Sequence, residues 1–166
     1  ADATNRSATL MGDFLTLFET LAFTTRGEIE IADHRLDLSK VDADLFVLGG
    51  VTDHITPWRA TYRSTQLFGS DDVTYVLSQS GHMQAILNPP GNPKAKYYVQ
   101  KGGGDLPATA EDWLAGTEEV AGSWWPFWME WVQKRSGPMK KAPRNLGGKG
   151  FEPTDPAPGL YVLEQA

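Results

Sequence analysis

Asp53 and His82 are the two side chains whose types and spacing fit acid–base chemistry. Asp53 comes just after the run ADLFVLGG (43–50), and His82 comes just after the run DVTYVLS (72–78). A neutral imidazole can take the proton of a nucleophile, while a carboxylate fixes the imidazole tautomer and stabilises the imidazolium that forms. The pattern therefore predicts the acid and the base of a catalytic triad, although a histidine after a strand is also common as a hydrogen-bonded loop residue.

The attacking group of such a triad is not found in the sequence. Cysteine is absent, and no G-x-S-x-G pattern occurs. Ser80, which precedes Gly81, comes nearest to that pattern, but we expect no strand-to-helix turn there, and Ser80 lies beside His82 in the chain. We therefore exclude Ser80 and infer that the chain holds an acid and a base without their nucleophile.

The other two histidines fit less demanding roles. His54, next to Asp53, is either a loop residue hydrogen-bonded to backbone or an accessory base. His34 lies in a predicted surface hairpin, where water would solvate it. Three scattered histidines, with no H-x-x-x-H or H-x-E pattern and no cysteine, predict that there is no metal site.

A strand–helix–strand unit would position Asp53 and His82. The apolar run 43–50 predicts a buried parallel strand, and residues 72–78 predict a second strand. Between them we expect a helix with Thr56 as N-cap and Pro57 at its first position, ending by Gly69. Because the carboxyl ends of parallel strands meet at one edge of a sheet, both side chains should emerge there.

Further elements follow from periodicity and capping residues. Four are predicted: a helix over 7–23 with Asn5 or Ser7 as N-cap, a short half-exposed β element within 27–41, a strand at 97–99 and a weak helix over 109–116. A Trp-rich helix over 122–138, capped by Ser123, carries Trp124, Trp128 and Trp131 on one stripe. This stripe either packs against the sheet or forms an exposed surface for a polymer, a partner or a lipid monolayer. GLYVLE near the C-terminus predicts an edge strand.

The composition is that of a globular domain. Of 166 residues, 40% are hydrophobic and 22% are charged, which argues against disorder. A net charge of −6 offers no electrostatic footprint for nucleic acid, and the basic stretch 134–144 is interrupted by Gly and Pro. No apolar run is long enough for a transmembrane helix.

Three longer blocks of the sequence resemble the poly(3-hydroxyalkanoate) synthases. They are GGVTDHITPWRATYRSTQLFG, YVLSQSGHMQAILNPPGNPKAKYY and GSWWPFWMEWVQKRSG. The D-H-I-x-P-W and S-G-H-x-Q-x-x-x-N-P-P motifs within them are specific, since neither is a general hydrolase signature. The resemblance implies an α/β fold, namely the C-terminal half of an α/β-hydrolase fold with a mostly parallel sheet and flanking helices, without its N-terminal strands and nucleophile elbow. Residues 1–25 would be the end of a cap subdomain, and residues 26–166 the C-terminal portion of the core.

The resemblance also implies a function. In that family a cysteine in a G-x-C-x-G elbow attacks the thioester of a 3-hydroxyacyl-CoA, releases CoA and carries the growing polyester. The histidine matching His82 activates the thiol, and the aspartate matching Asp53 either orients this histidine or activates the 3-hydroxyl of the incoming unit. The family needs no metal or organic cofactor and works as a cytoplasmic enzyme on polyester granules, generally as a homodimer.

Because its cysteine is absent, this chain alone is expected to be inactive. Two alternatives stay open: a fragment of an α/β-hydrolase esterase or depolymerase with a serine nucleophile, and a non-catalytic module that binds granules through the Trp-rich helix.

Overall fold

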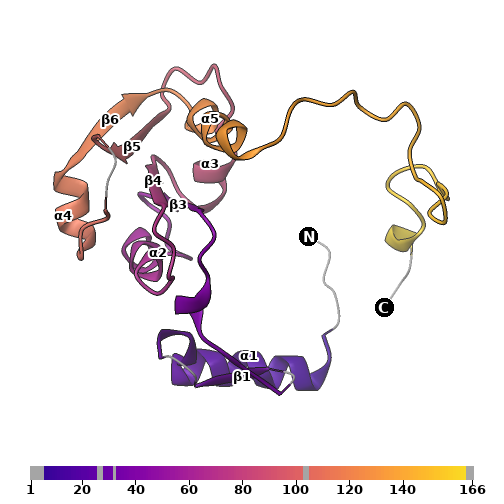
Figure 1. The fold of residues 1–166 in the computed structure, drawn as a ribbon, viewed down its shortest axis with the longest axis horizontal. Helices are drawn as coiled ribbons and strands as arrows, with labels where there is room; N and C mark the ends of the chain where they lie inside the picture. Colours follow the sequence, from indigo (N-terminus) through magenta and orange to yellow (C-terminus); the bar gives the residue numbers. More distant parts are fainter. Residues whose placement is uncertain (1–5, 26–27, 32, 103–104, 164–166) are drawn as a thin grey trace.

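A four-stranded sheet forms the centre of the structure, a computed structural model that describes residues 6–25, 28–31, 33–102 and 105–163 (Figure 1). Its strands, in spatial order, are β3 (Leu45–Gly50), β4 (Val73–Ser78), β5 (Lys96–Gln100) and β6 (Thr117–Ala121). β3 and β4 are parallel, whereas β4 pairs antiparallel with β5, and β5 pairs antiparallel with β6. The predicted α/β class is confirmed, as are the strands predicted at 43–50, 72–78 and 97–99.

The expectation of a mostly parallel sheet is wrong for the described strands. Parallel neighbours require a crossover to the opposite edge, which α2 (Trp58–Thr65) provides between β3 and β4. The connection from β4 to β5 contains only α3 (His82–Ile86), a five-residue helix, and re-enters the sheet at the edge where β4 ended. The chain therefore reverses direction at β5.

The helix α2 begins later than the sequence predicted. Pro57 occupies the N-cap position, and the first helical residue is Trp58. Thr56 is not the N-cap, because its backbone N–H and its hydroxyl both donate to the carboxylate of Asp53. The helix also ends at Thr65, before the predicted stop at Gly69. The weak helix predicted over 109–116 is confirmed as α4 (Ala110–Ala115), with the Thr109 hydroxyl accepting from the backbone N–H of Asp112.

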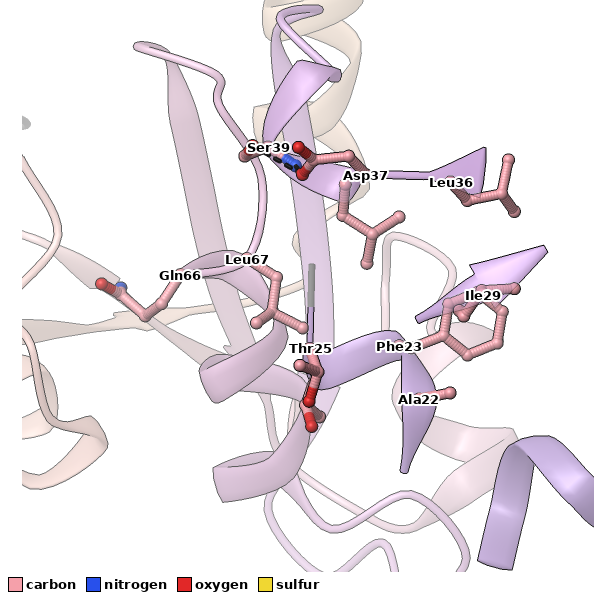
Figure 2. Close-up of a pocket in the computed structure, with 11 residues that line it drawn as sticks. Ala22, Phe23, Thr25, Ile29, Leu36, Asp37, Ser39, Gln66 and Leu67 are labelled. Atoms are coloured by element: carbon pink, nitrogen blue, oxygen red, sulfur yellow. Dashed lines mark hydrogen bonds between the residues drawn. The ribbon is translucent and has the colours of Figure 1, made fainter. Parts of the chain in front are cut away.

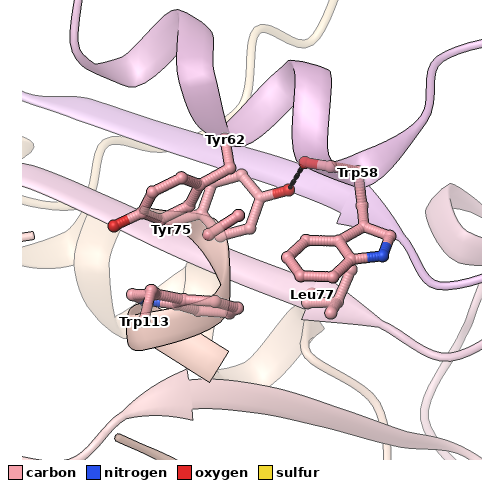
Figure 3. Packing of buried hydrophobic residues seen from close by; sticks show 6 residues of the cluster. Trp58, Tyr62, Tyr75, Leu77 and Trp113 are labelled. Atoms are coloured by element: carbon pink, nitrogen blue, oxygen red, sulfur yellow. Dashed lines mark hydrogen bonds between the residues drawn. The ribbon is translucent and has the colours of Figure 1, made fainter. Parts of the chain in front are cut away.

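One face of the sheet is covered by α2 and α4, which pack an aromatic cluster against β4 (Figure 3). The ring of Tyr75 lies 4.8 Å from that of Trp113 and 5.1 Å from that of Tyr62, both edge-on. The Tyr75 hydroxyl donates to the carbonyl of Trp58 at 2.9 Å. A Cβ on Gly49 would collide with this hydroxyl, so the glycine at the next-to-last position of β3 makes room for the cluster.

The opposite face is covered by α5 (Trp125–Arg135), the Trp-rich helix. Its predicted cap is displaced by one position: Trp124 is the N-cap residue, and the hydroxyl of Ser123 accepts from the N–H of Trp125 at 3.0 Å. Trp124 is 8% exposed and packs against Val76 and Tyr97 of the sheet. Trp128 is 39% exposed, so the predicted packing against the sheet holds for only part of the stripe.

The N-terminal elements lie away from the sheet (Figure 1). The predicted first helix is confirmed as α1 (Ala8–Thr20), with the Ser7 hydroxyl as its cap. The β element predicted within 27–41 is an antiparallel hairpin of β1 (Ile29–Ile31) and β2 (His34–Leu36). A small pocket lies between the hairpin, the short 3₁₀ turn η1 (Ala22–Thr24) and the residues after α2 (Figure 2). Neither Asp53 nor His82 lines this pocket.

The C-terminal residues extend away from the sheet (Figure 1). The prediction of an edge strand at GLYVLE is wrong. Tyr161–Leu163 form a single 3₁₀ turn, η3, and pair with none of the described strands. Prolines at 153, 156 and 158 precede this segment and lack the N–H that a ladder requires. The boundary predicted at residue 25 stays a prediction. None of the described helices is both long enough and apolar enough to span a bilayer.

Candidate active site

Asp53 and His82 are in direct contact at the edge where β3 and β4 end. Asp53 lies in the loop after β3, and His82 is the first residue of α3. The Nδ1 atom of His82 is 2.9 Å from Oδ2 of Asp53. The two side chains that the sequence singled out are therefore brought together by the parallel β3–β4 pair.

Backbone hydrogen bonds continue between the two loops beyond the strands. The N–H of Val51 donates to the carbonyl of Ser78 at 3.0 Å, and the N–H of Thr52 donates to the carbonyl of Ser80 at 3.2 Å. These bonds extend the parallel ladder up to the residue before Asp53. They fix the loop that carries the acid relative to the loop that carries the base.

The carboxylate of Asp53 is held by four hydrogen bonds. Oδ1 accepts from the N–H groups of Ile55 and Thr56, both at 2.9 Å. Oδ2 accepts from the Thr56 hydroxyl at 2.8 Å as well as contacting His82. Burial would raise the pKa of Asp53, but these hydrogen bonds outweigh it and hold the pKa of the carboxyl well below its ordinary value of 3.8. Asp53 is therefore ionised at neutral pH.

The orientation of His82 follows from this charge. An ionised carboxylate can only accept, so Nδ1 of His82 carries the proton in their shared hydrogen bond. In a neutral imidazole held in this way, Nε2 is the nitrogen able to take a proton. The His82 side chain is 36% exposed, against 6% for Asp53. The arrangement presents a buried acid and an accessible base, as general base catalysis requires.

Ser80 occupies a turn that the sequence reasoning missed. We excluded it because no strand-to-helix turn was expected, yet β4 ends at Ser78 and α3 begins at His82. Ser80 also has φ +95°, in the left-handed region that disfavours residues other than glycine. Among the described residues no hydrogen bond links its hydroxyl to His82. Of the two reasons for excluding Ser80, the absence of a strand-to-helix turn is thus wrong, whereas its position beside His82 in the chain stands. Its backbone shapes the turn, and its side chain is not hydrogen-bonded to the base.

The other histidines lie outside this pair. His54 is exposed, and within the described ranges its ring makes none of the side-chain hydrogen bonds found in the structure. His34 is exposed in β2, as predicted for a hairpin. In the part of the chain that the structure describes, no three acidic or histidine side chains come together as a metal site would require.

Thr56 was predicted to be the N-cap of a helix, but in the structure it donates two hydrogen bonds to Asp53. A carboxylate that accepts from backbone N–H groups two and three residues onward is an Asx-type turn, which Asp followed by Thr and Pro favours. The D-H-I-T-P string contained this signal. It was assigned to a helix cap because Thr followed by Pro also fits an N-cap.

No protein-family model matches this chain. Curated relatives do match it along nearly its whole length. Poly(3-hydroxyalkanoate) polymerase 2 of Ectopseudomonas oleovorans is 45% identical over 163 residues, and polymerase 1 of the same organism is 40% identical over 164. Poly(3-hydroxyalkanoate) polymerase of Methylorubrum extorquens is 39% identical over 172 aligned residues.

These matches cover 98%, 99% and 100% of this chain, but 28%, 29% and 27% of the respective relatives. The chain spans a little over a quarter of the length of each. The matches agree with the resemblance that the sequence motifs carried. The chain is therefore a relative of the poly(3-hydroxyalkanoate) polymerases, matching about a quarter of their length.

Proposed function

We propose that this chain is the C-terminal part of the catalytic domain of a poly(3-hydroxyalkanoate) polymerase, an acyltransferase on an α/β-hydrolase core. It supplies the acid and the base of a Cys–His–Asp triad. The observation that carries the proposal is the 2.9 Å contact between Nδ1 of His82 and Oδ2 of Asp53, in a chain related to such polymerases along nearly all its length. The nucleophilic cysteine comes from a part of the protein outside these 166 residues, since they contain none.

In the proposed reaction, Nε2 of His82 takes the proton of the cysteine thiol. The thiolate attacks the thioester carbonyl of a 3-hydroxyacyl-CoA, the bond to the CoA sulfur breaks, and the imidazolium returns its proton to the departing CoA thiolate. The acyl group is then held as a thioester on the cysteine. The 3-hydroxyl of another unit then attacks this thioester while Nε2 of His82 takes its proton. The bond to the cysteine sulfur breaks, an ester forms that lengthens the polyester, and the imidazolium returns the proton to the cysteine thiolate.

The geometry favours an orienting role for Asp53 over activation of the 3-hydroxyl. An ionised carboxylate offers about four lone-pair sites, and Asp53 already receives four hydrogen bonds. Its side chain is only 6% exposed, and its lowered pKa makes it a weak base. A substrate hydroxyl would have to displace one of these donors in order to be activated.

The partners of this function are a 3-hydroxyacyl-CoA and the growing polyester chain. The complete protein would work in the cytoplasm, on the surface of polyester granules, as a homodimer. It would need neither a metal nor an organic cofactor.

The test of the acid–base assignment uses the complete protein. His82→Gln should lower the rate of CoA release by about 10²–10⁴-fold, as expected for loss of a general base. Asp53→Asn should be similarly impaired, because an amide can present its NH₂ to Nδ1 and favour the wrong tautomer. His54→Gln is the matched control and should stay close to the wild type. Retained activity in both His82→Gln and Asp53→Asn would contradict the assignment.

The same acid–base geometry would serve a serine nucleophile in an esterase or depolymerase. Thiol alkylation of the complete protein distinguishes a cysteine nucleophile from a serine nucleophile. The reagent has no thiol to modify within these 166 residues, which contain no cysteine. Iodoacetamide should abolish CoA release if the nucleophile is a cysteine, and leave ester hydrolysis intact if it is a serine. The isolated 166-residue chain should release no CoA from 3-hydroxyacyl-CoA, and measured release would refute its dependence on an external nucleophile.

A further inference from the structure

The segment after β6 reaches the same edge of the sheet as Asp53 and His82. β4 and β6 are each antiparallel to β5, so they run in the same direction and end on the same side. The N–H of Gly122, just after β6, donates to the carbonyl of Ala95 just before β5, at 2.7 Å. Ser123, Trp124 and Trp125 follow at once and lie beside α3 rather than far from the site.

These three residues hold the carboxyl end of α3. The indole N–H of Trp124 donates to the carbonyl of Ala85 at 2.8 Å, and that of Trp125 donates to the carbonyl of Ile86 at 3.0 Å. The Ser123 hydroxyl donates to the carbonyl of Asn88, two residues beyond the end of α3. The final carbonyls of a helix have no partner within the helix, so donors from outside the helix satisfy them. The carbonyl of Ile86 also accepts from the backbone N–H of Asn88 at 3.0 Å, so the indole of Trp125 is its second donor. We call Ser123, Trp124 and Trp125 the α3 clamp.

The α3 clamp is itself anchored in the core. Trp124 is 8% exposed, its ring lies 6.0 Å from that of Phe46 in β3, and it packs against Val76 in β4. Ala85, which receives its hydrogen bond, is 2% exposed. A continuous path of packed atoms therefore runs from β3 and β4 through Trp124 to α3.

The helix that carries His82 needs such support. α3 has only five residues, and a single turn is unstable in water without tertiary contacts. Gly81 is its N-cap residue, and the positive φ of Ser80 just before it sets the direction in which the chain leaves β4. The first residue of α3, His82, faces Asp53, and the last two carbonyls of α3 accept from indole N–H groups. The position of the imidazole therefore depends on contacts at both ends of α3.

We propose that Trp124 and Trp125 are positioning residues for His82, holding α3 so that Nδ1 of the imidazole stays in contact with Asp53. This inference rests on the proposed function, because it takes His82 as the base. The indole N–H groups are the essential feature, since phenylalanine would keep an aromatic ring at each position and lose the donor.

The test compares three single variants of the complete protein in CoA release. Trp125→Phe and Trp124→Phe should each lower kcat by roughly tenfold while KM for the acyl-CoA stays within about twofold, because a displaced base impairs the chemical step rather than substrate binding. Trp131→Phe is the matched control. Its indole N–H has no hydrogen-bond partner among the described residues, so the substitution removes ring area without removing a bond, and kcat should stay within about twofold of the wild type.

A second comparison separates positioning from general loosening of the fold. In a His82→Gln background, Trp125→Phe should cause no further loss of activity, because the base on which it acts is gone. A further tenfold loss in that background would overturn the proposal, as would a fall in kcat of the same size in Trp131→Phe. Wild-type kcat in both Trp124→Phe and Trp125→Phe would also overturn it.

The failure of this inference is distinguishable from failure of the proposed function. If His82→Gln is inactive while both clamp variants keep wild-type kcat, His82 remains the base and the clamp is unnecessary. If His82→Gln keeps wild-type activity, the catalytic assignment itself is wrong, and with it the positioning role of the α3 clamp.

Discussion

The hydroxyl of Thr56 and the imidazole of His82 meet at the same atom, Oδ2 of Asp53. Thr56 Oγ lies 2.8 Å from this oxygen and His82 Nδ1 lies 2.9 Å from it. Thr56 comes three residues after Asp53, whereas His82 comes from the next loop of the sheet edge. A local turn and a base from a distant part of the chain therefore hold the same carboxylate oxygen.

Replacing Thr56 by valine should impair catalysis without removing a catalytic group. Thr56→Val keeps the branched shape and the backbone N–H but loses the donor to Oδ2, so the pKa of Asp53 should rise and its carboxylate should be less firmly oriented. We expect kcat for CoA release in the complete protein to fall by about three- to tenfold, the value of one hydrogen bond. Thr56→Ser restores the donor and should recover most of the rate. Equal rates for the valine and serine variants would contradict this role.

The depressed pKa of Asp53 should make stability depend on pH in the acid range. Because the folded pKa lies below the ordinary 3.8, the unfolded chain takes up a proton more readily, and stability is lost as the pH falls below about 4 toward the folded pKa. The Asp53→Asn variant lacks the titrating carboxyl, so this pH-dependent part of the stability is absent from it. The difference in unfolding free energy between wild type and Asp53→Asn, measured with urea at pH 7, 5, 4 and 3, should be constant down to pH 5 and change in favour of the variant below it. A constant difference down to pH 3 would refute this.

Gly50 should be intolerant of a methyl group. A Cβ there would lie 2.9 Å from the carbonyl oxygen of Ser80, 3.0 Å from Cβ of Ala85 and 3.2 Å from Cβ of Asp53. Gly50→Ala should push the two loops apart, lower CoA release by about 10²-fold and reduce the free energy of unfolding by about 1–3 kcal/mol. Gly12→Ala, in α1 with nothing within 4 Å of the new Cβ, should instead raise helix stability by about 0.5–1 kcal/mol. Wild-type activity in Gly50→Ala would show that the loops can separate freely.

Arg135 should contribute to stability but not to catalysis. Its Nε lies 2.6 Å from Asp44 Oδ2, a terminal nitrogen contacts Asp72, and the guanidinium lies 4.0 Å from the ring centre of Trp131. Asp44 and Asp72 precede β3 and β4, at the edge opposite to His82. Lysine cannot make both contacts and stack on the ring, so Arg135→Lys should lower the free energy of unfolding by about 1 kcal/mol.

The Arg135 effect should shrink in high salt, because the ion pairs are partly exposed. The rate of CoA release should be unchanged. Lys134→Met, at the exposed neighbouring position, is the control and should alter stability by less than about 0.5 kcal/mol. If Arg135→Lys is as stable as the wild type in urea unfolding at low salt, the contacts of Arg135 with Asp44, Asp72 and Trp131 do not stabilise the fold.

The sequence was sufficient to place Asp53 and His82 because local signals and topology agreed. Both follow short apolar runs, and a single helix lies between the runs, which is the pattern of a parallel pair. The contact between the two side chains then follows from the direction of the strands. What local signals could not supply was the turn around Ser80, where the conformation depends on backbone contacts with the neighbouring loop.

The sheet beyond β4 could not be predicted in the same way. β6 has the sequence TEEVA, which offers little apolar alternation. Its pairing is supported across the sheet by Glu119, which contacts the Lys96 amine at 2.7 Å and the Tyr98 hydroxyl at 2.8 Å. Strand direction is likewise absent from a hydrophobic pattern. Conversely, GLYVLE has the apolar residues of a strand but no neighbouring strand to pair with among the described residues.

The outer edge of β3 is open to pairing with another strand along most of its length. β3 is the first strand of the four-stranded order, and its six residues pair on only one side with a described strand, apart from a bridge between Gly50 and Pro57. At about 3.3 Å per residue, this leaves a row of amide and carbonyl groups roughly 20 Å long. An unpaired row of this kind is a template for other strands. Concentrated solutions of the chain by itself should therefore associate edge to edge, so its solubility reports whether that side is covered.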